Sequence, residues 1–479
     1  MEIKEIVKVI EEKKIENFSL RICDLDGRQV HFTIPVERFY RNSRLDTSFF
    51  ENGVAFDGSS IEGFKSIEQS DLLAVPDIQS AVVDNISKTP TLVFHCNLID
   101  PEGNVSYWLD PRAVAKRAEK YLIETGIADT AFFGLEIEFF LFDSVKWKIG
   151  EGFSYHNIAS AEGGIGEFED IGDKYKIRPQ EGYLKMPPFD QFKEIRDEMV
   201  KKLKETEFMI ERDTHERATA GSAEIDIKYQ PLLKMADQML LFKYLIRNVA
   251  ASYHKMATFM PKPLRGHNGN GMHLHHSLWK EGKPLFYDPE GSYYQLSKLA
   301  MQYLGGILTH AKSLSAITSP SVNSYKRLVP GFEAPTTIAF GYRNRSTCIR
   351  IPAYPDKPEA KRIEFRIPDP STNPYLCFAA IMLAGIDGVK RRIDPVKAGF
   401  GPLEKNGYDL VQKEKEKIQF IPGSLDRALN ELEKDHAYLL EGGVFTKEFL
   451  ELWITHKRNE IKKINQYPDA VDFEFYFDC

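Results

Sequence analysis

The feature that most constrains this chain is a segment of alternating acidic and apolar residues, Phe133–Phe140. A β-strand sends successive side chains to opposite faces, so Glu136 and Glu138 share one face while the apolar residues between them share the other. Two carboxylates beside so much apolar surface carry a large desolvation cost unless a positive charge compensates them. Divalent cations such as magnesium and manganese prefer carboxylate oxygen, so the segment favours a metal site over a solvated strand face.

Other strand-like segments also mix charged with apolar residues, unlike the uniformly apolar strands of a doubly wound parallel sheet. From Asp110 onward they alternate with long helical patterns. These patterns cover roughly residues 111–126, 190–206, 233–256, 292–313 and 371–390. We therefore expect an α+β fold in which helices cover one side of an antiparallel sheet.

The first hundred residues follow a different pattern. Isoleucines and a valine at helical spacing predict an amphipathic helix over residues 2–14. Alternating segments at 18–23 and 29–34 flank Asp26-Gly27, a strong signal for a tight hairpin. A further strand is expected at 91–99. This region predicts a small sheet with one or two helices.

Length and composition limit the class of protein. A chain of 479 residues is too long for one compact core, so we expect two domains, 1–109 and a larger catalytic domain, 110–479. The net charge of -7 gives no reason to propose nucleic acid as a partner. No apolar run is long enough to cross a membrane, and the charged start does not resemble a signal peptide. Five cysteines without CxxC spacing favour reduced thiols and a cytoplasmic location.

A second carboxylate cluster lies in residues 215–226. Ala220-Gly221-Ser222 predicts a turn between two short strands, which would bring Glu216 close to Glu224. Two inward-facing glutamates repel each other unless a cation or a shared proton separates them. A surface hairpin with ordinary charges would explain the same residues, so this segment alone does not decide the matter.

A loop rich in glycine and asparagine, within residues 261–277, precedes two histidines. Glycine permits positive φ and close backbone approach, as a ligand-binding loop requires. His273 and His275 then share one strand face. One imidazole is suited to bind a metal and the other to contact a nucleotide, although single histidines are more often ordinary core or surface groups.

Arginines concentrate between residues 327 and 366. In Arg362–Arg366 the two arginines and Glu364 share one strand face. A sheet edge with ordinary cross-strand ion pairs would show the same pattern. Guanidinium groups bind carboxylate and phosphate through two hydrogen bonds, which suits a substrate that carries both. The chain has no Walker-type and no kinase-type glycine-rich loop, so a nucleotide would bind by another scheme. These residues together predict ATP-dependent phosphoryl transfer to a small carboxylate.

Several segments, in the same order and across nearly the whole chain, resemble glutamine synthetases of the prokaryotic type I class. They are Phe56–Ile61, Phe133–Phe140, Pro261–Ser277, Asn323–Gly331 and Asn373–Tyr375. The resemblance implies an N-terminal β-grasp domain and a large catalytic domain built on a curved antiparallel sheet with helices. It implies amidation of L-glutamate by ammonium, driven by ATP through γ-glutamyl phosphate, with two divalent metals, Mg²⁺ or Mn²⁺, at each active site.

The resemblance also assigns roles to individual residues. One metal would be held by Glu138, Glu216 and Glu224, and the second by Glu136, His273 and Glu364. Substrate contacts would come from Ser60, Tyr183, Asn268, Gly269, Arg327 and Arg366. ATP would be contacted by Glu211, Tyr229, His275, Ser277 and Arg362, with Glu359 at a position where the family has a lysine near the adenine. Asp57, Glu333, Arg345 and Arg350 would act in catalysis.

The resemblance also implies partners or motion at three residues. Ammonium must be bound and deprotonated before it attacks an acyl phosphate, and the family lends Asp57 to the neighbouring subunit for this purpose. The resemblance therefore implies a homo-oligomer, a dodecamer of two hexameric rings. Glu333 matches a mobile flap that shields the intermediate from water. Tyr408, in a loop expected to be accessible, resembles a tyrosine that an adenylyltransferase modifies in one branch of the class, although a plain loop tyrosine fits as well.

Two alternatives stay open. A γ-glutamyl–amine ligase of the same family would join glutamate to a larger amine, whereas Asp57 and Tyr183 favour a small ammonium pocket. A non-catalytic family member would be expected to lack metal ligands, and all six candidates are present.

Overall fold

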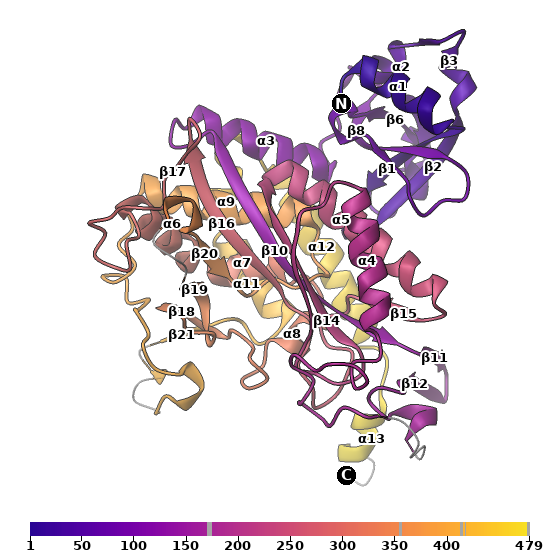
Figure 1. Ribbon diagram of the computed structural model, residues 1–479. Coiled ribbons are helices and arrows are strands. Elements are labelled where there is room, and N and C mark those ends of the chain that lie inside the picture. The colour runs from indigo at the N-terminus through magenta and orange to yellow at the C-terminus, as the bar shows by residue number, and fades with distance from the viewer. Residues whose placement is uncertain (170–174, 354–356, 412–414, 417, 477–479) are drawn as a thin grey trace.

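The computed structural model describes residues 1–169, 175–353, 357–411, 415–416 and 418–476. Figure 1 shows a small N-terminal part at the upper right, in indigo, beside a larger part that contains the rest of the chain. Both parts combine a sheet with helices, so the predicted α+β fold class is confirmed. No helix in these described ranges has the length and apolar character needed to span a membrane.

The N-terminal part is built on a seven-stranded sheet. Its helices and strands are α1 (Ile3–Lys13), β1 (Asn17–Cys23), β2 (Gln29–Pro35), β3 (Tyr40–Arg41), β4 (Arg44–Leu45), α2 (Ser48–Asn52), β5 (Val54–Asp57), β6 (Asp71–Pro76), β7 (Val82–Val83), β8 (Thr91–Asp100) and β9 (Val105–Ser106). The strand order is β2-β1-β8-β6-β5, with β7 and β9 also paired to β8. β1 runs antiparallel to β2 and parallel to β8. The helix and the hairpin expected near the N-terminus are present as α1 and β1–β2.

The tip of the β1–β2 hairpin is held against the larger part. Gly27 has φ of +80°, and a Cβ atom there would lie 2.7 Å from the Cα of Asn373, so only glycine fits. The Asn373 side chain donates hydrogen bonds to the carbonyls of Asp24 and Leu25, at 3.0 and 3.2 Å. These contacts fix the position of the tip.

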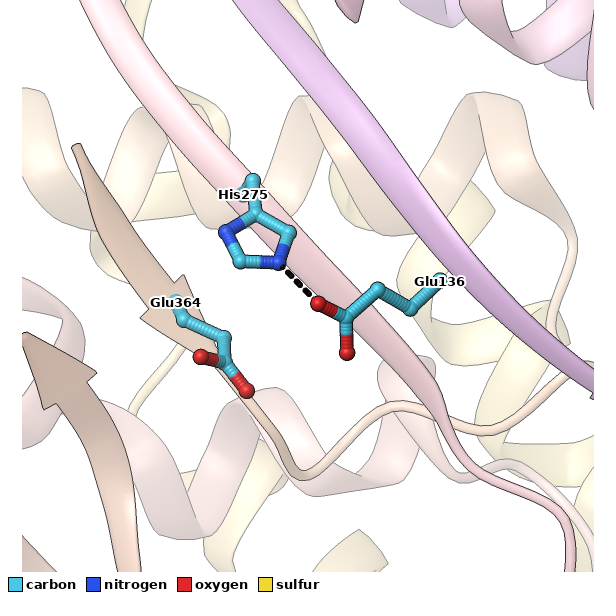
Figure 2. A group of neighbouring side chains, drawn as sticks. All are labelled: Glu136, His275 and Glu364. Atoms are coloured by element: carbon cyan, nitrogen blue, oxygen red, sulfur yellow. Dashed lines mark hydrogen bonds and ion pairs between the residues drawn. The ribbon is translucent and has the colours of Figure 1, made fainter. Parts of the chain in front are cut away.

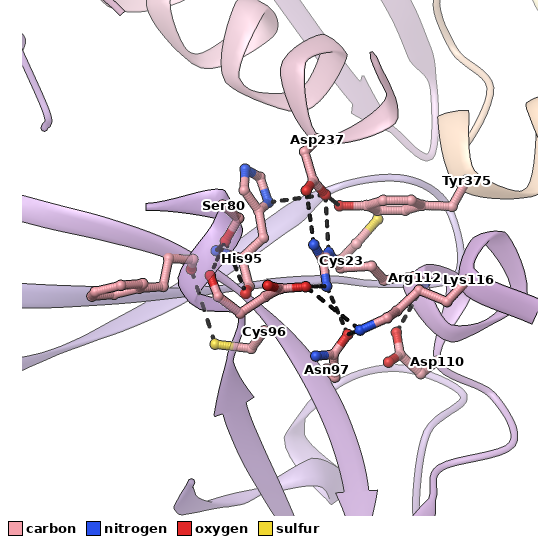
Figure 3. A network of polar contacts seen from close by, with 12 residues as sticks. Cys23, Ser80, His95, Cys96, Asn97, Asp110, Arg112, Lys116, Asp237 and Tyr375 are labelled. Carbon is pink, nitrogen blue, oxygen red and sulfur yellow. Dashed lines mark hydrogen bonds and ion pairs between the residues drawn. The ribbon is translucent and has the colours of Figure 1, made fainter. Parts of the chain in front are cut away.

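A buried network of hydrogen bonds and ion pairs around Arg112 also joins the two parts (Figure 3). Its guanidinium donates to Asp237 at 3.0 and 2.8 Å, and to Asp77 and Asn97 of the N-terminal part at 2.9 and 2.6 Å. The hydroxyl of Tyr375 also donates to Asp237. Removing one partner of a buried ion pair typically costs about 3–5 kcal/mol, so this network opposes rotation of one part against the other.

The larger part is built on a ten-stranded sheet. Its strands are β10 (Thr130–Phe142), β13 (Ile210–His215), β14 (Ser222–Pro231), β15 (Met256–Thr258), β16 (Met272–Lys280), β17 (Lys283–Pro284), β18 (Thr337–Tyr342), β19 (Thr347–Ile351), β20 (Ile363–Phe365) and β21 (Gln419–Phe420). The order is β13-β14-β10-β16-β20-β19-β18-β21, with β15 on β10 and β17 on β16. Strands β11 (Ser144–Gly150) and β12 (Phe153–Ala159) form a separate hairpin.

The expectation of an antiparallel sheet is wrong at one pair. β18 and β19 run parallel, whereas the other pairs of this sheet in the described ranges are antiparallel. The chain reverses at Arg343, which has φ of +58°, and returns through residues 344–346. Side chains alternate between the two sheet faces in parallel and antiparallel strand pairs alike, so the sequence pattern could not distinguish a parallel pair from an antiparallel one.

The helices of the larger part are α3 (Pro111–Glu124), α4 (Lys193–Glu205), α5 (Leu232–Ser252), α6 (Lys298–Thr309), α7 (Ala311–Thr318), α8 (Ser324–Arg327), α9 (Pro374–Lys390), α11 (Leu425–Lys434), α12 (Lys447–Ile464) and α13 (Ala470–Tyr476). Helices α3, α5 and α9 pack against the apolar face of β10 in the large sheet. The single helix expected over 292–313 is instead α6 and α7, which begin later because Tyr294 and Gln295 adopt positive φ.

Packing behind β10 determines which of its faces stays open. Phe133 stacks on Phe378 of α9 with ring centroids 4.8 Å apart, and Phe139 packs against Phe242 of α5. Each fully buried side chain of this kind stabilises the fold by about 1.5–3 kcal/mol. The opposite face of β10 is therefore the one that presents Glu136 and Glu138.

Candidate active site

The open face of the sheet collects carboxylates from neighbouring strands. On β10, Glu136 lies opposite Asp226 of β14 and opposite His273 of β16. Two residues on, Glu138 lies opposite Glu224 of β14. The expected common face of Glu136 and Glu138 is confirmed by this register.

The turn expected at residues 220–222 is also present. Ala220 and Gly221 have φ of +63° and +74°, and the Glu216 N–H donates to the carbonyl of Ser222 at 2.8 Å. The buried carboxylate of Glu162 accepts from the Gly221 N–H and, at 3.1 Å, from His215 Nε2. This support for the turn was missed by sequence reasoning because Glu162 lies about fifty residues away along the chain.

Two groups of metal-ligand type share Glu136. Its carboxylate accepts from His275 Nε2 at 2.7 Å and from His273 Nδ1 at 3.0 Å. In Figure 2, Glu136, His275 and Glu364 point toward one another from three adjacent strands. Ligand atoms of these three residues lie within 4.8 Å of one another, as do those of Glu136, Glu224 and His273.

The grouping of the histidines differs from the expectation. His275, expected to contact the nucleotide, lies beside Glu364, whereas His273 lies beside Glu224. The cause is the register between β16 and β20, which places His275 directly opposite Glu364. Glu138 and Glu216 belong to neither compact group, although both line the same cleft.

Excess negative charge perturbs the acidic side chains of this face. Burial, with repulsion from Glu216, raises the pKa of Glu138 to about 8. Burial and repulsion from Glu136 raise the pKa of Asp226 to about 6 and that of Glu224 well above its usual range. Clustered carboxylates that retain protons near neutral pH are the electrostatic mark of a site that lacks positive charge.

Local cations compensate only part of that charge. Arg212 donates to Glu224 and to Asp226, both at 2.8 Å, and was not among the expected residues. Glu364 is fully buried between the guanidinium groups of Arg350 and Arg366, with which it forms ion pairs. Burial opposes its ionisation, but the two arginines outweigh burial and lower the pKa of Glu364 to about 2.

Most of the remaining candidate site residues line two adjoining cavities. The small cleft, about 40 Å³, is lined by the side chains of both glutamate clusters and by Tyr183, Asn268, Gly269, Arg327, Glu333, Arg345 and Arg366. The larger cavity, about 800 Å³, is lined by all five expected nucleotide contacts, Glu211, Tyr229, His275, Ser277 and Arg362, and by Arg350. Glu136, Arg212 and Arg345 line both. Lys357 and Glu359 both line the larger cavity. A lysine is therefore present near Glu359, the position at which the resemblance implies a lysine in the family.

Asp57 and Ser60 are not brought to either cavity of their own chain. Asp57 ends β5 in the N-terminal part and Ser60 lies in the turn after it, where the exposed Asp57 carboxylate accepts from the hydroxyls of Ser59 and Ser60, both at 2.6 Å. Its contribution from a neighbouring subunit stays a prediction.

Two loop residues lie beside the cleft. Glu333, at φ of +58°, accepts from Arg217 at 3.1 Å and from Asn268 at 3.3 Å. Tyr408 was expected to be accessible, but its ring is half-buried and its hydroxyl donates to the carbonyl of Ala334 at 2.6 Å. Burial raises the pKa of Tyr408 to about 12. Its modification stays a prediction.

Comparisons with known proteins agree across the chain. Residues 14–101 match the family described as glutamine synthetase, beta-Grasp domain, and residues 108–476 match glutamine synthetase, catalytic domain. A glutamine synthetase of Mycolicibacterium smegmatis is 48% identical over 481 residues, covering 99% of this chain and 98% of the relative. The cryo-EM structure of Plasmodium falciparum glutamine synthetase superposes with a TM-score of 0.88 at 31% identity, covering 99% of each chain. A GmaS/ADP complex superposes with a TM-score of 0.81 at 28% identity, again over 99% of both chains. This chain therefore belongs to the glutamine synthetase family, and to its prokaryotic, type I kind.

Proposed function

We propose that this chain is an ATP-dependent glutamate–ammonia ligase that forms L-glutamine through γ-glutamyl phosphate. The observation that carries the proposal is the meeting of two cavities at Glu136 and Arg345. One cavity is small and rich in carboxylates and arginines, as glutamate and metal require. The other has room for a nucleotide. A relative of the same fold is known as an ADP complex, which supports this division.

Two divalent ions, Mg²⁺ or Mn²⁺, fit the acidic face. Glu138, Glu216 and Glu224 would hold one, and Glu136, His273 and Glu364 the other. The fit rests on the raised pKa values of Glu138 and Glu224 and on His273, whose pKa is lowered to about 4 by burial and by Arg366, so that its imidazole is neutral. Since His275 is nearer to Glu364 in this conformation, it is a second candidate for the histidine ligand. When bound, the metals neutralise phosphate charge and polarise the transferring group.

The arginines divide the remaining tasks. Arg327 is held rigidly by the carbonyls of Ile367, Pro368 and Arg366, and its place in the cleft suits a substrate carboxylate. Arg345 is exposed at the junction of the cavities, without an ion-pair partner in the described ranges. It is therefore available to stabilise charge on the transferring phosphoryl group, with Arg350 beside it.

The last step needs ammonia beside the acyl phosphate and no water. Asp57 of a neighbouring subunit would bind ammonium and take up its proton. Glu333 would close the cleft over the intermediate, in keeping with its position between Arg217 and Asn268. This arrangement requires a homo-oligomer, which we propose to be a dodecamer.

Further features follow from family membership. We propose domains at 1–109 and 110–479, a cytoplasmic location, and Tyr408 as a candidate for adenylylation by an adenylyltransferase. The half-buried hydroxyl of Tyr408 would have to leave Ala334 before it could be modified.

An assay for phosphate release tests the function. Purified protein with ATP, Mg²⁺ or Mn²⁺, and L-glutamate should release phosphate when ammonium is added, and an Arg345→Gln variant should not. Release that requires putrescine or another amine in place of ammonium would favour the γ-glutamyl–amine ligase. No phosphate release with either nucleophile would favour a non-catalytic role.

Metal binding should release protons at pH 7. Because the pKa of Glu138 is about 8, its carboxyl is mostly protonated at that pH and must lose its proton to bind a cation. The affinity for Mn²⁺ should therefore fall as the pH drops from 8 to 6. Isothermal titration calorimetry in two buffers with different ionisation enthalpies measures the released protons. A Glu138→Gln variant should release about one proton fewer, and an identical heat in both buffers would contradict the prediction.

A further inference from the structure

A cavity of about 630 Å³ lies apart from the two described above. The β1–β2 hairpin, helix α5, helix α12 and the loops at 258–261, 320–323 and 370–371 form its walls. Among the residues that the structure describes, its lining shares no member with the cleft or with the nucleotide cavity. It therefore lies at the contact between the N-terminal hairpin and the larger part.

Two cations, one helical turn apart on α5, line this cavity and form no ion pair with any residue that the structure describes. The Lys243 side chain is only 8% exposed, and in the described ranges its ammonium group forms no hydrogen bond or ion pair. The Arg247 guanidinium lies over the Phe259 ring, 5.3 Å from its centroid, and likewise forms no ion pair with a described residue. Burial and the nearby Arg247 lower the pKa of Lys243 to about 8. Burying an unpaired ammonium group costs free energy, so an anion bound beside Lys243 would stabilise the folded protein.

In the described part of the chain, the acidic groups near the cavity form no ion pair with Lys243 or Arg247. Asp26 accepts from Lys457 at 2.6 Å and from His456 at 3.1 Å, and Glu460 accepts from the same lysine at 3.1 Å. Asp24 and Asp369 lie near Lys243 but beyond ion-pair distance. Asp24 accepts from the Arg28 N–H, and Asp369 Oδ1 accepts from the Ser371 N–H, while Asp369 Oδ2 has no hydrogen-bond partner in the described ranges. The lining thus keeps a positive excess although the chain carries a net charge of -7.

We propose that this cavity binds a small oxyanion, a phosphate- or carboxylate-bearing molecule, between Lys243 and Arg247. The guanidinium group offers two parallel donors that match either kind of oxyanion, and the ammonium group adds a compact charge. Leu240, Phe259 and Pro261 supply apolar wall for a short carbon skeleton. The volume exceeds that of inorganic phosphate alone, which favours a small organic acid or ester.

The location connects the cavity with the glutamate-binding loop. The carbonyl of Pro261, in the wall, accepts from the Asn270 N–H at 2.8 Å, and Asn323 accepts from the Lys262 N–H at 2.6 Å. The loop that carries Asn268 and Gly269 therefore begins at the cavity wall. An anion bound there would join the N-terminal hairpin to the base of that loop.

Binding of two simple probes, inorganic phosphate and succinate, tests the proposal on the full chain. Calorimetry should detect a binding class that Lys243→Met and Arg247→Gln weaken by at least about tenfold. The class should persist in Arg345→Gln, which alters the active-site cavities, and in the control Lys120→Gln, whose side chain is 77% exposed on α3. Phosphate binding without succinate binding would identify a phosphate-type ligand, and the reverse a carboxylate.

Thermal unfolding provides a second readout. Without added anion, Lys243→Met should melt at the same temperature as the wild type or higher, because it removes an unpaired buried charge. In the wild type, the probe that binds should raise the melting temperature. Any part of that rise that Arg345→Gln abolishes reports binding at the active site. The remaining part should be absent in both Lys243→Met and Arg247→Gln. Anion binding that is equal in the wild type and both cavity variants, or no binding of either probe outside the active site, would overturn the proposal.

Discussion

Replacing Glu136 with glutamine should lower turnover by about 10²–10³-fold or more, with little change in melting temperature. Removal of one group that stabilises developing charge in an active site typically has an effect of this size. Glu136 belongs to both compact groups of ligand type and lines both cavities. Glutamine keeps its volume and one acceptor for the imidazoles of His273 and His275, but it loses the charge that a metal requires.

A matched control is available on the neighbouring strand. Asp226 lies opposite Glu136 on the same sheet face and pairs with Arg212, but it is not among the proposed ligands. Asp226→Asn should therefore keep turnover within about tenfold of the wild type, because it removes charge without removing a ligand. Steady-state kinetics with saturating metal, and Mn²⁺ affinity by calorimetry, measure both variants. Equal losses in the two would mean that net charge, and not ligation, governs the site.

The parts of this site that sequence could predict are those set by local geometry. Strand alternation is sufficient to place Glu136 and Glu138 on one face, and turn chemistry is sufficient to bring Glu216 back toward Glu224. Both features depend only on residues adjacent in the chain. The same is true of α1 and the first hairpin, where spacing and Asp26-Gly27 carry the signal.

The parts that sequence could not predict depend on register between distant strands. His275 lies opposite Glu364 because β16 pairs with β20, and nothing in either segment states that register. The pairing of Arg212 with Glu224 across β13 and β14 was likewise missed, although a charge facing two carboxylates on a hairpin is a detectable signal. The burial of Glu364 between two arginines also appears only in three dimensions.

Mixing two inactive variants should restore activity, and this is the second large effect expected. Asp57→Asn removes the proposed base and Arg345→Gln removes the phosphoryl-stabilising cation, so each alone should lose about 10²-fold or more. Asp57 lines neither cavity of its own chain, and among the described residues its exposed carboxylate accepts hydrogen bonds from the neighbouring Ser59 and Ser60. If each site takes Asp57 from one subunit and Arg345 from the next, some sites in a mixed ring contain both intact residues.

The recovered fraction can be calculated from random assembly. A site works when its Asp57 comes from an Arg345→Gln chain and its Arg345 from an Asp57→Asn chain, each with a probability of about one half. Dissociation, mixing in equal amounts and reassembly should therefore restore about one quarter of wild-type activity in a closed ring with heterologous interfaces. Reassembly of either variant alone should restore none. Native mass spectrometry shows whether the two kinds of chain have mixed. If a mixed assembly stays inactive, then Asp57 acts in the site of its own chain or has no catalytic role. Mixing creates a site with intact Asp57 and intact Arg345 only when the two residues come from different chains.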